Sequence, residues 1–67
     1  MNTSRFFIII EDGIKFYEHK IGDKPSLKDD RFKNHIMLYV LSRVDPQTDP
    51  ESLWDVDIKR AYRDLYG

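Results

Sequence analysis

The histidines are the first side chains to consider for chemistry, and their spacing gives no metal site. His19 and His35 lie far apart in the sequence, with no His-x-His or HExxH pattern around them. Asp12, Asp23 or Asp29 could complete a site, but a solvated or hydrogen-bonded histidine is the simpler interpretation. The chain has no cysteine, which excludes disulfides and thiolate ligands. We therefore expect neither a metal nor a cofactor.

The hydroxyl and carboxylate side chains form no catalytic pattern. No Gly-x-Ser-x-Gly sequence frames any serine, and the three glycines are too scattered for a phosphate-binding loop. Ser26 and Ser52 stand where helices are expected to begin, so capping explains them. Asp55 and Asp57 are expected to be surface charges on the C-terminal helix. The sequence thus predicts no catalytic residue and a protein that is not an enzyme.

A basic segment is the one feature that favours nucleic acid. Its cations, interleaved with Tyr17, could bind phosphates while the ring stacks on a base. They are Lys15, Lys20, Lys24, Lys28, Arg31 and Lys33. Four acids in the same segment reduce these six cations to a balance of +2, and the whole chain carries a net charge of −1. Nucleic-acid-binding domains are usually more basic, so this function is the alternative hypothesis.

Aromatic side chains give the stronger signal. They make up 13% of the chain, and Tyr and Trp are enriched at the energetic centres of protein interfaces. Surplus apolar surface on a small chain indicates a partner protein or self-association. The candidate partner-binding residues are Phe7, Ile9, Tyr17, Tyr39, Trp54, Tyr62 and Tyr66.

The N-terminal third is expected to form an antiparallel β-hairpin over residues 5–20. Residues 5–10 are β-branched and aromatic, as in strands. Asp12-Gly13 is a strong hairpin-turn signal, and residues 14–20 alternate in polarity. Because strand one is apolar on both faces, it is expected to lie inside a sheet or to pair with another chain.

Residues 26–44 allow two interpretations. Ser26 with Asp29 resembles a capping box, while the apolar run 36–41 is compatible with a buried helix or a buried strand. Met and Leu favour a helix, and a strand would leave a long charged loop before it. We favour a helix over residues 35–44, ending at Val44 because Pro46 disfavours helical backbone before it. Residues 45–49 are then the last loop.

The last nineteen residues are the clearest helix. Asp49 can cap it, Pro50 suits its first position, and Glu51 lies where the helix dipole favours an anion. The apolar side chains recur at helical spacing and share one face. They are Trp54, Ile58, Ala61, Tyr62 and Leu65. This stripe is expected to clamp the helix onto the sheet.

These elements predict one α+β domain over residues 1–67, with the hairpin followed by two helices packed on the sheet. The alternative fold is a three-stranded antiparallel sheet with a C-terminal helix. Sixty-seven residues are near the lower limit for unaided folding, so a homodimer is also considered. The longest apolar run, residues 6–10, is too short to span a membrane or to be a signal peptide.

The function predicted from these features is a non-enzymatic protein-binding module in the cytoplasm. It would act as a small regulator or inhibitor that occupies a partner's surface. Accessory proteins of phages and mobile elements are often of this size and composition, which is an association of class only. The alternative is a weak nucleic-acid binder that uses residues 15–33.

Overall fold

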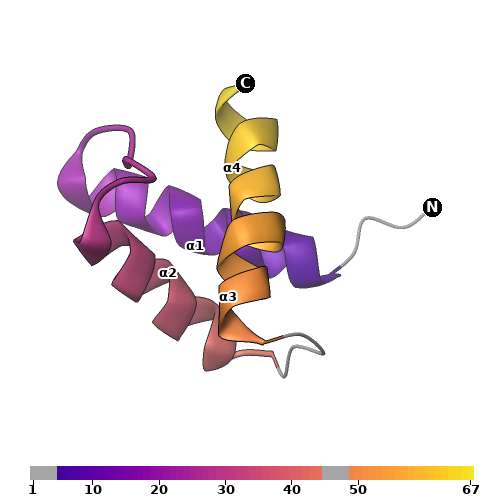
Figure 1. Ribbon diagram of the computed structural model, residues 1–67. Helices are drawn as coiled ribbons and strands as arrows, with labels where there is room; N and C mark the ends of the chain where they lie inside the picture. Colours follow the sequence, from indigo (N-terminus) through magenta and orange to yellow (C-terminus); the bar gives the residue numbers. More distant parts are fainter. Residues whose placement is uncertain (1–4, 45–48) are drawn as a thin grey trace.

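Helices make up the fold in the computed structural model, which describes residues 5–44 and 49–67. Helix α1 spans Arg5–Ile21 and α2 spans Asp30–Leu41. The C-terminal segment is continuously helical: α3 covers Pro50–Ser52, a π-helical stretch η1 covers Leu53–Ile58, and α4 covers Lys59–Tyr66. Figure 1 shows α1 beside α2 and the C-terminal segment crossing this pair. These residues contain no strand, so the predicted α+β fold and its three-stranded alternative are both wrong.

Residues 5–20 belong to a helix, and the predicted β-hairpin is wrong because helical spacing outweighs β propensity. Ile10, Gly13, Ile14 and Tyr17 are buried on one side of α1, three or four residues apart. A β-branched residue costs well under about 1 kcal/mol in a helix. Fully burying one isoleucine side chain contributes about 1.5–3 kcal/mol, so packing decides the backbone. Helix α1 ends before Gly22, whose φ of +75° suits glycine.

Gly13 lies inside α1, where the sequence indicates a turn. A Cβ placed on Gly13 would lie 2.6 Å from Ile36 Cδ1 and 2.7 Å from Tyr39 Cδ1. Such distances are far inside ordinary carbon–carbon contact. The glycine therefore lets α1 and α2 approach closely. Gly13 of the Asp12-Gly13 pair is needed for helix packing, and the pair does not form a hairpin turn.

The helical interpretation of the middle segment is confirmed, with different bounds. Asp29 is the N-cap of α2, because its carboxylate accepts from the Arg31 backbone N–H at 2.9 Å. Ser26 instead accepts from the Lys28 backbone N–H at 3.1 Å, before the helix begins. Helix α2 ends at Leu41 and not at Val44. Of the expected loop 45–49, residues 45–48 lie outside the described part of the chain.

The predicted start of the C-terminal helix is confirmed. The Asp49 carboxylate accepts from the Ser52 backbone N–H at 2.8 Å, and Pro50 occupies the first turn. In η1 the hydrogen bonds join residues five apart, which brings Leu53 onto the same side as Ile58. Both side chains are fully buried.

The core lies where the C-terminal segment crosses the α1–α2 pair. Trp54 is 6% exposed, and its ring packs edge-on against Phe32 of α2 at a centroid distance of 6.1 Å. The buried apolar side chains are those of Ile10, Ile14, Tyr17, Phe32, Ile36, Val40, Leu53, Trp54, Ile58 and Ala61. The expected clamp therefore exists, but it holds helices together and not a helix on a sheet.

The loop between α1 and α2 is fastened to α4. The Tyr62 hydroxyl donates to the Pro25 carbonyl at 2.6 Å. Lys24 Nζ lies over the rings of Tyr62 and Tyr66, 5.7 and 5.3 Å from their centroids. Burial and the neighbouring Glu18 carboxylate raise the pKa of Tyr66 to about 12, so this hydroxyl stays neutral.

Candidate functional site

Most of the aromatic residues expected at an interface belong to the core or its border. Tyr17 and Trp54 are almost fully buried. Partly buried side chains packed against the core are those of Phe7, Tyr62 and Tyr66. Ile9 and Tyr39 are half-buried. Tyr39 is the half-buried member of the predicted set that joins a partly exposed cluster of aromatic and apolar side chains.

That cluster lies across α1 and α2, and we call it the α1–α2 surface. It consists of Phe16, His35, Leu38 and Tyr39. The Phe16 ring stacks on His35 at a centroid distance of 5.8 Å and lies 6.3 Å from the Tyr39 ring. His35 and Tyr39 are 6.1 Å apart. Phe16 is 56% exposed, and Leu38, which follows His35 by three residues on α2, is 71% exposed, so both apolar side chains face solvent.

The C-terminal segment leaves the α1–α2 surface uncovered. On α2, Lys33 Nζ lies 5.4 Å from the centroid of the Trp54 ring, so Lys33 marks the side of α2 that faces the C-terminal segment. Leu38 comes five residues later, and at about 100° per residue it projects about 140° away from Lys33 around the helix. On α1, Phe7 contacts Arg60 of α4 at 5.5 Å. Phe16 projects from about the opposite side of α1 by the same geometry. The C-terminal segment thus covers one side of the helix pair (Figure 1), and by helical geometry Phe16 and Leu38 project away from that side.

Positive charges surround the α1–α2 surface. Burial lowers the pKa of His35, and the positive charges of Lys20 and Arg43 lower it further. A hydrogen bond with the Gly13 backbone acts in the opposite direction and raises this pKa. His35 Nε2 is buried and has no hydrogen-bond partner among the described residues. The imidazole therefore serves as a neutral aromatic ring. Arg43 lies over Tyr39, with Cζ 3.6 Å from the ring centroid, and donates to the Tyr39 carbonyl.

The basic residues proposed for nucleic acid are dispersed. Lys24 lies over aromatic rings of α4, Lys33 lies over Trp54, and Lys20 lies near His35. The other cations of the set, Lys15, Lys28 and Arg31, are exposed on α1, on the loop and on α2. Tyr17 is only 7% exposed and packs on Phe32 at 5.3 Å. The expected stacking surface therefore does not form at Tyr17.

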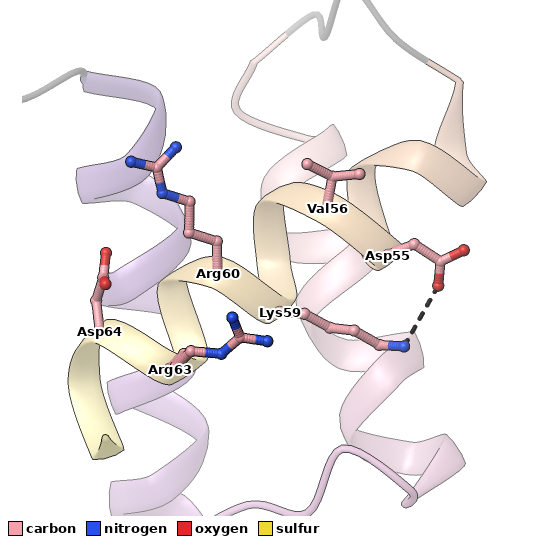
Figure 2. A pocket seen from close by; sticks show the side chains of 6 residues that line it. All are labelled: Asp55, Val56, Lys59, Arg60, Arg63 and Asp64. Atoms are coloured by element: carbon pink, nitrogen blue, oxygen red, sulfur yellow. Dashed lines mark ion pairs between the residues drawn. The ribbon is translucent and has the colours of Figure 1, made fainter.

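The hollows on the surface present charges without a catalytic arrangement. Figure 2 shows one of about 460 Å³ on the outer side of η1 and α4, where Lys59 pairs with Asp55 at 3.4 Å. Its remaining lining residues are Val56, Arg60, Arg63 and Asp64. A second hollow, of about 680 Å³, is lined by Lys15, Glu18, His19 and Gly22 on the C-terminal half of α1. Neither hollow is lined by a serine, threonine or cysteine that could act as a nucleophile.

Metal and membrane sites have no support in the described residues. Within residues 5–44 and 49–67, no group of three or more histidine, aspartate or glutamate side chains could hold a metal ion. No helix in the same ranges has the length and apolar character needed to cross a membrane.

Two serines at helix ends make local hydrogen bonds. The Ser42 hydroxyl donates to the Tyr39 carbonyl, and the Ser52 backbone N–H donates to the Asp49 carboxylate.

Comparison with known proteins gives no indication of function, so the candidate site is identified from the structure. No family model, curated protein or solved structure matches the chain. The α1–α2 surface is therefore the candidate functional site on physical grounds alone.

Sequence reasoning missed three of its members, Phe16, His35 and Leu38. On a helix, Phe16 follows Gly13 and Lys20 follows Phe16 along one side at spacings of three and four. His35 and Leu38 are likewise neighbours on α2. Helical spacing over residues 5–21 contains this signal, but the predicted β-hairpin divides residues 14–20 between the two faces of a sheet.

Proposed function

We propose that this chain is a non-enzymatic protein-binding module that uses the α1–α2 surface to occupy a partner's surface. The observation that carries the proposal is the exposure of Leu38 and Phe16, 71% and 56%, on the side that the C-terminal segment leaves open. Large apolar side chains grouped on one exposed side are typical of interaction sites.

The energetics support burial of this surface by a partner. Fully burying one such leucine or phenylalanine side chain contributes about 1.5–3 kcal/mol. The stack of Phe16 on His35 holds its ring in place, so less side-chain freedom is lost on binding.

Affinity capture tests the proposal. The tagged chain and a Phe16→Ala, Leu38→Ala double variant are incubated with native lysate, with and without nuclease. Both changes are at exposed positions and are expected to leave folding intact. Val56→Ala is the matched control, because Val56 is 60% exposed on η1.

We expect a stoichiometric protein partner that resists nuclease, is lost with the double variant and is retained by Val56→Ala. Equal capture by the double variant would contradict the proposed surface. A partner removed by nuclease would favour the nucleic-acid alternative.

A further inference from the structure

We infer that the α1–α2 surface binds an amphipathic helix of a partner protein that carries carboxylates beside an apolar stripe. The inference rests on the proposed function and adds the chemistry of the partner. Its basis is the placement of the exposed apolar side chains Phe16 and Leu38 among unpaired cations.

The cations stand one turn from the apolar members. Lys20 follows Phe16 by four residues on α1, and Arg31 precedes His35 by four residues on α2. Arg43 lies over Tyr39. Among the described residues, the acid at a comparable position is Asp12, four residues before Phe16. Counted over the described residues, three cations against one carboxylate make this surface positive, although the chain as a whole carries a net charge of −1.

These cations have no carboxylate partner among the described residues, although Arg43 donates to the Tyr39 carbonyl and to Ser42 Oγ. Across residues 5–44 and 49–67, the ion pair formed is that of Lys59 on α4 with Asp55 on η1. Lys20 and Arg43 therefore have no described carboxylate in contact. Carboxylates of a partner would complement them, which favours the correct partner over others and speeds association.

A second copy of this chain is a poor occupant of the same surface. A two-fold symmetric dimer would bury the α1–α2 surface against itself. Two positive surfaces would then meet, with Lys20 and Arg43 of each copy near the same cations of the other. Like charges placed together across an interface oppose association.

Nucleic acid fits the charge but not the apolar side chains. Leu38, the most exposed large apolar residue in the described ranges, has no flat ring on which a base could stack. One side of the Phe16 ring already stacks on His35. A helix that inserts apolar anchors at spacings of three and four residues can instead bury Leu38 and Phe16 together.

Three synthetic helical peptides of equal length test the inference. The first carries a leucine stripe flanked by glutamates, the second the same stripe flanked by lysines, and the third the glutamates with serines in place of the leucines. Fluorescence anisotropy measures their binding to the intact chain at low and high salt. We expect the leucine–glutamate peptide to bind about tenfold or more tightly than the lysine peptide, with affinity falling as salt rises. The serine peptide should not bind.

Variants separate the apolar and charged contributions. Phe16→Ala with Leu38→Ala should abolish binding of the leucine–glutamate peptide. Lys20→Glu with Arg43→Glu should reverse the preference towards the lysine peptide. Lys28→Glu with Arg63→Glu, which changes the net charge equally at other exposed positions, should leave the preference unchanged. Circular dichroism confirms that each variant is folded.

The outcomes distinguish the inference from the proposed function. Equal affinity for the acidic and basic peptides, or a preference that Lys20→Glu with Arg43→Glu does not alter, overturns the inference. If a lysate partner still depends on Phe16 and Leu38, the binding function itself survives that result. A dimer in sedimentation that dissociates with Phe16→Ala, Leu38→Ala, or displacement of the acidic peptide by an oligonucleotide, would also overturn the inference.

Discussion

Replacing Gly13 by alanine tests whether α1 and α2 are as close as the structure places them. In an open helix this change should stabilise the protein by about 1 kcal/mol, because alanine is the better helix former. Here the new Cβ would lie 2.6 Å from Ile36 Cδ1 and 2.7 Å from Tyr39 Cδ1. Carbon atoms prefer about 3.5–4.0 Å, so both side chains must retreat by about 1 Å.

The sign of the effect follows from what can move. Ile36 is fully buried, so its displacement disturbs the packed core. Overpacking of this kind costs about 1–3 kcal/mol, which exceeds the gain in helix propensity. We expect Gly13→Ala to destabilise the fold by a net amount of about 1 kcal/mol. For a domain of this size, that lowers the melting temperature by about 4–8 °C.

Urea denaturation followed by circular dichroism measures the effect, and Ile36→Val supplies the internal control. Valine lacks the Cδ1 atom that the new Cβ approaches most closely. Gly13→Ala should therefore cost less in the Ile36→Val background, with a coupling of about 1 kcal/mol. A stabilising Gly13→Ala whose effect adds independently to that of Ile36→Val would refute the close approach of the two helices.

Three further predictions concern the core, the helix cap and the histidine. Trp54→Ala should destabilise the protein by about 3–5 kcal/mol in the same denaturation assay, and a wild-type-like result would place the ring outside the core. Hydrogen bonds from Ser52 lower the pKa of Asp49 in the folded protein. The charged cap therefore stabilises the fold fully at pH values above 3.8, the ordinary pKa, and this stabilisation is lost as the pH falls through the lowered pKa. Melting temperatures across this range should show that loss, and Asp49→Asn, which keeps a neutral cap, should not. Burial and Lys20 lower the pKa of His35 below 6.5, so its contribution to stability is present above that pH and is lost as pH falls through the lowered pKa. An NMR titration giving 6.5 or more would contradict this.

The sequence by itself determined the start of the C-terminal helix and part of what the helix buries, although the fully buried Leu53 lies outside the predicted stripe. Asp49 and Pro50 act within a few residues of the helix start, so local chemistry is sufficient to place it. Trp54 and Ile58 are buried as predicted, because a helix with a single apolar stripe packs that stripe against the rest of the protein. The helical nature of α2 was also predictable from its composition, although its bounds were not.

Tertiary structure alone decided the backbone of residues 5–21 and the composition of the candidate site. Their β-branched and aromatic content favours a strand locally, but burial against residues distant in sequence stabilises the helix by more. Phe16 and Tyr17 are adjacent aromatic residues, yet Phe16 is exposed and Tyr17 is buried. Which of the two faces solvent depends on where α2 and the C-terminal segment pack, and neither position can be read from the residues of α1 because packing is a property of the assembled helices.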